Sequence, residues 1–132
     1  MITGLNNTLM VLEDYDAIRC LLERTCSENG YSIISTGNLT DALEVVREYH
    51  PRVIIFDVDM KAVKDPLRAM AQLIAELPNS NIIAIDAKAI VKEQQLLSSG
   101  AAAVVHQSPL YVGFEQGITA LLHNIIAGRQ IN

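Results

Sequence analysis

The sequence predicts an α/β fold in which a parallel, doubly wound sheet carries helices on both faces. Two observations lead to this prediction. Five short apolar runs alternate along the chain with five longer segments of helical period. Several of these runs are continuously apolar rather than alternating, as strands are when both faces of their sheet are covered. Strands that alternate with helices in this way form parallel sheets.

The five predicted strands are rich in Val and Ile and are bounded by turn residues. They are TLMVL (8–12), YSIIS (31–35), VIIF (53–56), NIIAI (81–85) and AAVVH (102–106). The first, third and fourth are the nearly continuous apolar runs, which places helices on both faces of the sheet.

The five predicted helices each have a start or stop signal. They span about 16–30, 40–49, 66–77, 89–99 and 110–127. The first stops at Gly30, which readily adopts the left-handed conformation of a helix cap. Asn38 or Thr40 caps the second helix, and Asp65 caps the third, with Pro66 at its first helical position.

Length and composition limit the possible functions. The chain has 132 residues, half of them apolar, which fits one domain over 1–132 with a core at about 8–127. With 15 acidic against 10 basic residues, its net charge of −5 does not favour binding to nucleic acid or to an anionic membrane. No apolar run approaches the ~18 residues of a membrane span. We find no leader pattern, no CxxC motif and no Cys/His cluster, and expect a reduced, cytoplasmic protein without zinc.

Acidic residues follow three of the predicted strands. Glu13 and Asp14 come after the first strand, Asp57 and Asp59 after the third, and Asp86 after the fourth. Because the carboxyl ends of parallel strands meet at one edge, where ligands bind in such sheets, we expect five carboxylates to converge. Clustered oxygens without thiolates or imidazoles suit a hard cation such as Mg²⁺ or Ca²⁺. Such an ion also neutralises a phosphoryl group carried by a carboxylate.

Four segments in this order resemble the receiver domain of two-component response regulators, of the kind seen in the stand-alone chemotaxis regulator. They are VLEDYDAIR (11–19), PRVIIFDVDM (51–60), NIIAIDAKA (81–89) and GAAAVVHQSP (100–109). The resemblance spans about residues 8–127 and implies a flavodoxin-like sheet with strand order 2-1-3-4-5.

The resemblance also implies a site and a function in phosphorelay signal transduction. Asp57 would accept a phosphoryl group from a sensor histidine kinase or a phosphotransfer protein. Mg²⁺, or alternatively Ca²⁺ or Mn²⁺, would be held by Glu13, Asp14, Asp57 and the backbone carbonyl of Asp59. The chain would not be an enzyme beyond catalysing its own phosphorylation and dephosphorylation.

The family's output surface comprises the fourth helix, the fifth strand and the fifth helix. Output would therefore reach a protein partner or a C-terminal effector domain outside this chain, and a homodimer through the fourth and fifth helices is an expectation at family level. We expect neither direct nucleic-acid binding nor membrane binding.

Three positions of the family's phosphorylation switch depart from its pattern. Asp86 stands where the family has Thr or Ser, and a carboxylate repels a phosphoryl group instead of donating to it. Gln107 stands where the family has a Lys that pairs with the phosphoryl oxygens, and it brings no charge. Val104 replaces the switch aromatic. These changes put the conformational switch in question more than the fold.

Two loop lysines are candidates for the missing positive charge. Lys88 lies two residues after Asp86, and Lys61 lies four residues after Asp57, where it replaces a family proline. Either lysine could reach the acidic site, and the alternative for both is a solvated loop lysine.

Two further functions stay open besides phosphoryl acceptance at Asp57. A pseudo-receiver would be a phosphorylation-independent interaction or dimerisation module that keeps the scaffold without the switch. A metal-dependent hydrolase would use Asp59 as a catalytic acid. Such hydrolases usually carry an added cap that encloses the substrate, and 132 residues leave no room for one.

Overall fold

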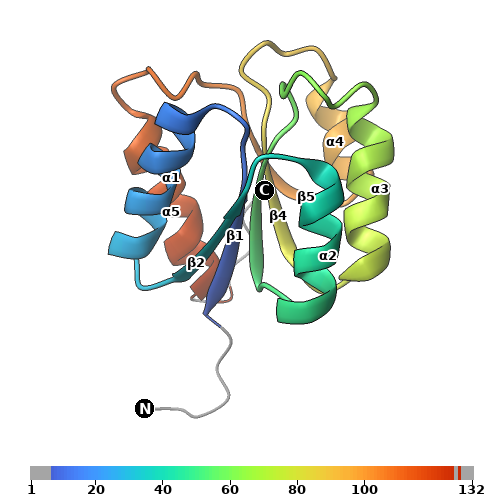
Figure 1. The fold of residues 1–132 in the computed structure, drawn as a ribbon. Coiled ribbons are helices and arrows are strands. Elements are labelled where there is room, and N and C mark those ends of the chain that lie inside the picture. The colour runs from blue at the N-terminus through green and yellow to red at the C-terminus, as the bar shows by residue number, and fades with distance from the viewer. Residues whose placement is uncertain (1–6, 127, 129–132) are drawn as a thin grey trace.

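The computed structural model describes residues 7–126 and 128, and these residues contain a single five-stranded sheet. Its parallel strands are β1 (Thr8–Leu12), β2 (Ser32–Thr36), β3 (Val53–Asp57), β4 (Asn81–Ile85) and β5 (Ala101–Val105). They lie in the order β2-β1-β3-β4-β5 (Figure 1). The predicted flavodoxin-like α/β sheet and its strand order are confirmed.

In the same described part of the chain, five helices cover the two faces of this sheet. They are α1 (Asp16–Glu28), α2 (Leu39–Tyr49), α3 (Pro66–Glu76), α4 (Glu93–Ser98) and α5 (Phe114–Ile126). Helices α1 and α5 pack on one face, and α2, α3 and α4 pack on the other (Figure 1). The strand order reverses between β1 and β3, so the carboxyl ends of these two strands flank the crevice where ligands bind in such folds.

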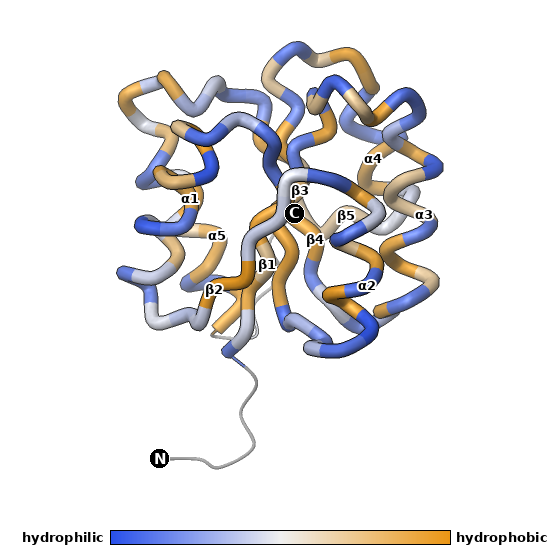
Figure 2. The backbone as a smooth tube through the Cα atoms, in the orientation of Figure 1, coloured by the Kyte–Doolittle hydropathy of each residue, from blue (hydrophilic) through white to orange (hydrophobic). Residues whose placement is uncertain are grey.

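The central strands are buried on both faces, which explains their continuous apolar runs. Leu9 and Val11 of β1 belong to the cluster under α1 and α5, whereas Met10 and Leu12 belong to the cluster under α2, α3 and α4. Successive side chains of a strand point to opposite faces, so a strand covered on both sides needs an apolar residue at every position. Figure 2 shows this hydrophobic centre inside more hydrophilic helix surfaces.

Several of the predicted helix ends are confirmed by capping bonds. The Asn38 side chain accepts the Asp41 N–H at 2.8 Å, and the Asp65 side chain accepts the Arg68 N–H at 3.1 Å. Gly30, just after α1, has a φ of +89°, a left-handed conformation that a glycine adopts without steric cost.

Two helices begin later than the sequence pattern predicts. Helix α4 starts at Glu93 rather than near 89, because residues 86–91 form a turn closed by the side chain of Asp86. Helix α5 starts at Phe114 rather than near 110, because Tyr111 N–H bonds to the Ser108 carbonyl in a separate turn. The predicted end of α5 at 127 lies outside the described residues. Strands β2 and β5 are each displaced by one residue from their predicted bounds.

Both cysteines lie on α1 as free thiols, Cys20 exposed and Cys26 buried. Among residues 7–126 and 128, no helix is both long and apolar enough to cross a bilayer.

Candidate functional site

Three carboxylates meet where β1 and β3 end. Glu13 and Asp14 directly follow β1, and Asp57 is the last residue of β3. Leu12 pairs with Phe56 in the parallel register, which brings the next residues of both strands together. One carboxylate oxygen from each acidic residue lies within 4.8 Å of the other two. This spacing and oxygen-only donor set fit a hard divalent cation.

Glu13 is the most enclosed member of this acidic cluster of Glu13, Asp14 and Asp57. Its side chain is buried, and its Oε2 accepts the N–H groups of Asp14 at 2.9 Å and of Tyr15 at 3.5 Å. Burial raises the pKa of Glu13 to about 9, helped by a hydrogen bond and by the negative charge of Asp57. A bound cation would reverse this preference for the protonated form, since metal ligands must be deprotonated.

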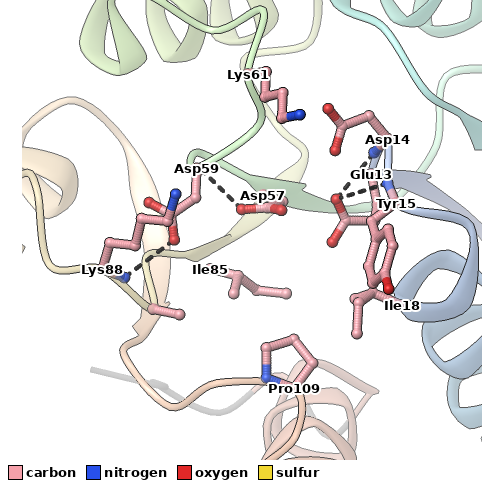
Figure 3. Close-up of a pocket in the computed structure, with 11 residues that line it drawn as sticks. Glu13, Asp14, Tyr15, Ile18, Asp57, Asp59, Lys61, Ile85, Lys88 and Pro109 are labelled. Atoms are coloured by element: carbon pink, nitrogen blue, oxygen red, sulfur yellow. Dashed lines mark hydrogen bonds between the residues drawn. The ribbon is translucent and has the colours of Figure 1, made fainter.

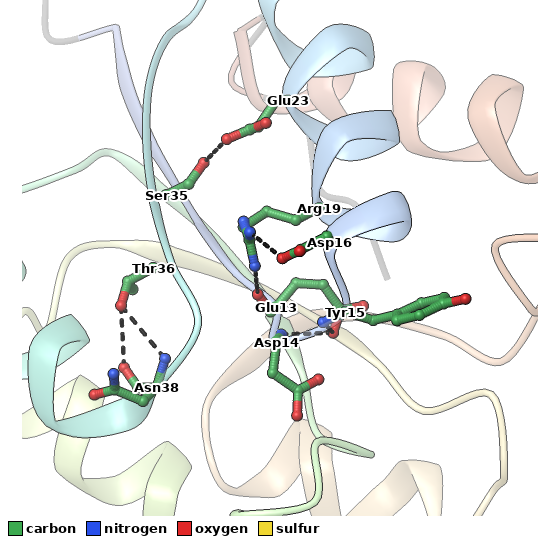
Figure 4. A network of polar contacts seen from close by, with 9 residues as sticks. All are labelled: Glu13, Asp14, Tyr15, Asp16, Arg19, Glu23, Ser35, Thr36 and Asn38. Carbon is green, nitrogen blue, oxygen red and sulfur yellow. Dashed lines mark hydrogen bonds and ion pairs between the residues drawn. The ribbon is translucent and has the colours of Figure 1, made fainter.

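The backbone that carries Glu13 and Asp14 is fixed by a polar network (Figure 4). The Glu13 N–H donates to the Thr36 carbonyl of β2 at 3.0 Å. Arg19 donates to the Glu13 carbonyl at 3.0 Å and also pairs with Asp16. The chain therefore cannot leave this conformation without breaking bonds to both α1 and β2.

Asp59 borders the acidic cluster without joining it. Its N–H donates to Asp57 Oδ1 at 2.8 Å, which orients the Asp57 side chain (Figure 3). Its own Oδ2 accepts the Lys88 N–H at 3.1 Å, and its Oδ1 is buried with no hydrogen-bond partner in the described part of the chain. Burial is the main cause that raises the pKa of Asp59, and Asp57 and Asp86 add to it by their charge.

A pocket of about 500 Å³ opens over these residues. Its acidic and cationic lining was foreseen from the sequence and comprises Glu13, Asp14, Asp57, Asp59, Lys61 and Lys88. Its remaining wall was missed and comprises Tyr15, Ile18, Ile85, Ala87 and Pro109. Their positions in the sequence could have indicated them, because each lies at or just after the end of β1 or β4, near the start of α1, or in the β5–α5 loop.

Asp86 does not join the expected group of five carboxylates. Its side chain is fully buried, and its two oxygens accept the N–H groups of Ile90 at 3.1 Å and Val91 at 3.2 Å. These loop N–H groups supply the hydrogen bonds that a buried carboxylate needs. The side chain is directed toward them and is absent from the pocket lining. The structure thus brings together three of the five acidic residues and places Asp59 beside them.

The other two switch positions, Gln107 and Val104, also lie away from the pocket. Gln107 is exposed and directed toward α5, where a methyl group added at Gly117 would meet its Oε1 at 3.7 Å. Val104 packs partly buried against the α2, α3 and α4 face. His106 Nδ1 lies 3.1 Å from the Asp86 carbonyl.

This geometry agrees with comparisons to known proteins. The sequence model of the response regulator receiver domain family matches residues 9–108. The chain belongs to this family. The polar-differentiation response regulator DivK of Brucella ovis is 24% identical over 109 residues, covering 82% of this chain and 89% of DivK. The transcriptional regulatory protein AfsQ1 of Streptomyces coelicolor is 32% identical over 56 residues, which is 42% of this chain but only 25% of AfsQ1.

Solved receiver domains share the fold. One of them is the receiver domain of sensor histidine kinase PA1611 from Pseudomonas aeruginosa, which has a magnesium ion coordinated in its active site cleft. It aligns with a TM-score of 0.74 and 17% sequence identity, and the alignment covers 93% of this chain and 99% of the PA1611 domain. Another is a response regulator from Burkholderia pseudomallei with a phosphorylated aspartic acid and a calcium ion. It aligns with a TM-score of 0.73 and 21% sequence identity, and the alignment covers 93% of this chain and 72% of that protein.

Proposed function

We propose that this receiver domain binds Mg²⁺ and accepts a phosphoryl group on Asp57 in phosphorelay signalling. The carrying observation is that oxygens of Glu13, Asp14 and Asp57 lie within 4.8 Å of one another. The proposed ligands are these three side chains and the backbone carbonyl of Asp59. Receiver domains with magnesium or with calcium and a phosphorylated aspartate support this assignment.

The reaction needs little from the chain beyond positioning. A carboxylate oxygen of Asp57 attacks the phosphorus of a phosphohistidine or a small phosphodonor, the bond between phosphorus and the donor breaks, and the donor leaves with that electron pair. Asp59 N–H donates to Asp57 Oδ1 at 2.8 Å, which holds the Asp57 carboxylate in one orientation. A bound Mg²⁺ supplies positive charge against the anionic phosphoryl group.

The proposed partners are a sensor histidine kinase or a phosphotransfer protein as donor, and a protein partner or effector domain as output. We propose that the phosphoryl transfer takes place in the cytoplasm and that the chain acts as a single signalling domain. Its only chemistry would be the phosphorylation and dephosphorylation of its own Asp57. A homodimer through α4 and α5 is an additional proposal, which light scattering during size-exclusion chromatography tests directly.

Labelling with acetyl phosphate tests the proposal. The protein is incubated with acetyl phosphate and Mg²⁺, and its intact mass is measured with time. We expect one added phosphoryl group, lost in Asp57→Asn and after removal of Mg²⁺. Asp65→Asn is the matched control, because Asp65 is an exposed acidic residue on the loop that follows β3. Labelling that persists in Asp57→Asn would disprove the assignment.

A pseudo-receiver is the second candidate, and one observation favours it. Asp86 bonds to the loop N–H groups of Ile90 and Val91, so the residue at the family's switch position is already engaged. In this case Mg²⁺ would still bind, while acetyl phosphate and beryllofluoride would leave mass and spectra unchanged.

A further inference from the structure

The loop between β4 and α4 is shaped by Asp86, a buried carboxylate that the proposed chemistry at Asp57 does not use. Asp86 has no exposed surface, and its side chain accepts two N–H groups from the end of the loop, those of Ile90 and Val91. Its backbone carbonyl accepts the Ala89 N–H at 3.1 Å. Three hydrogen bonds to one residue therefore close residues 86–91 into a tight turn.

This turn adopts a conformation that its sequence does not favour. Ala89 has a φ of +51°, in the left-handed region that residues with a Cβ seldom occupy. The loop contains no glycine to relieve this strain. The bonds from Asp86 are the interactions that offset it, so the path of the turn depends on this carboxylate.

Lys88 lies inside the turn and lines the acidic pocket. Its backbone N–H donates to Asp59 Oδ2 at 3.1 Å, which fixes the residue from a second side. Figure 3 shows Lys88 and the carboxylate of Asp59 on one side of Asp57, with Glu13 and Asp14 on the opposite side. A cation held by the acidic cluster would therefore occupy the side of Asp57 away from Lys88.

The other lysine of the pocket is placed differently. Figure 3 shows the Lys61 ammonium directed toward Asp14, on the side of the acidic cluster, where a bound divalent ion would repel it. Gln107 points toward α5 and contributes nothing to the pocket lining. Among the described residues that line the pocket, Lys88 is therefore the positively charged side chain that lies on the side of Asp57 opposite the proposed metal site.

We propose that the Lys88 ammonium faces the phosphoryl group on Asp57, and that Asp86 is the positioning residue that holds Lys88 in place. This inference rests on the proposed function. Lys88 contributes a charge-assisted hydrogen bond, the contact that Gln107 does not provide. Asp86 acts through the turn and does not touch the phosphoryl group.

The test measures the rate of acetyl phosphate labelling in the presence of Mg²⁺, by intact mass, for matched lysine variants. We expect Lys88→Met to lower the rate about tenfold or more, the range of one charge-assisted hydrogen bond. Lys88→Arg should recover most of the rate. Lys92→Met is the control, because Lys92 is exposed on the same loop outside the pocket, and its rate should stay within about twofold of wild type.

Asp86 is tested by a double-mutant cycle. Asp86→Ala should slow labelling to a similar extent, and Asp86→Ala combined with Lys88→Met should be no slower than Lys88→Met alone. Hydrogen exchange of the Ile90 and Val91 amides should accelerate about tenfold or more in Asp86→Ala, while β1 amides stay protected. Asp86→Asn retains one acceptor oxygen and serves as the milder variant if Asp86→Ala does not fold.

The outcomes separate this inference from the proposed function. If wild type is labelled and Lys88→Met labels like Lys92→Met, the role of Lys88 is disproved and the function stands. If the effects of Asp86→Ala and Lys88→Met multiply, Asp86 does not act through Lys88. If wild type is never labelled, the proposed function fails and this inference fails with it.

Discussion

The buried carboxyl of Glu13 should make Mg²⁺ binding strongly dependent on pH. Burial and the neighbouring Asp57 raise the pKa of Glu13 to about 9. The metal-free protein therefore holds a proton on Glu13 at pH 7, and a cation that binds this carboxylate must displace it. About two pH units separate pH 7 from that pKa, which weakens binding by about 3 kcal/mol, or about a hundredfold.

We expect the dissociation constant for Mg²⁺ to fall about tenfold per pH unit from pH 6 to pH 8 and to level off near pH 9. Calorimetric titration in two buffers with different heats of ionisation measures both the affinity and the release of one proton. Glu13→Gln should bind more weakly and lose this slope, and Asp65→Asn should keep it. A wild-type dissociation constant that stays constant from pH 6 to pH 9 would refute the reasoning.

The same proton affects the stability of the metal-free protein. Because the pKa of Glu13 is raised from 4.5 to about 9, the folded state holds a proton that the unfolded chain releases between these values. The contribution of Glu13 to the free energy of unfolding is therefore full below pH 4.5 and declines as pH rises toward 9. Urea unfolding at a series of pH values should show this decline in wild type and a shallower one in Glu13→Gln.

Three further predictions concern the fold. Cys20 should react with a maleimide reagent at pH 8 while Cys26 does not, because burial raises the pKa of the Cys26 thiol to about 12; equal labelling by mass would contradict this. Phe56→Ala should lower the free energy of unfolding by about 3–5 kcal/mol in urea, since Phe56 is fully buried, and a loss under 1 kcal/mol would be inconsistent with its packing. Asn38→Ala should cost about 1 kcal/mol through loss of the α2 cap, and Asn38→Asp should retain most of it.

The strands and most helix ends were predictable from the sequence because they depend on local signals. A strand covered on both faces needs consecutive apolar residues, and those residues are visible in 8–12, 53–56 and 81–85. The starts of α4 and α5 were not predictable in the same way. Apolar residues continue the helical pattern back through Ile90 and Leu110, whereas hydrogen bonds from side chains and turns decide where each helix begins.

The acidic cluster was predictable because parallel register brings the ends of β1 and β3 together. The place of Asp86 was not, since its position at the end of β4 does not reveal that the N–H groups of Ile90 and Val91 lie within its reach. Gln107 is similar, because its position after β5 does not reveal that its side chain lies near Gly117 of α5, ten positions further along the chain.

The position of a bound cation tests the central claim most directly. Crystals grown with Mn²⁺ give an anomalous signal that locates the ion independently of any assumption about the site. We predict one strong peak among the carboxylates of Glu13, Asp14 and Asp57, absent in Asp57→Asn crystals. A fully occupied Mn²⁺ elsewhere on the protein, with no peak between these three residues, would contradict the account.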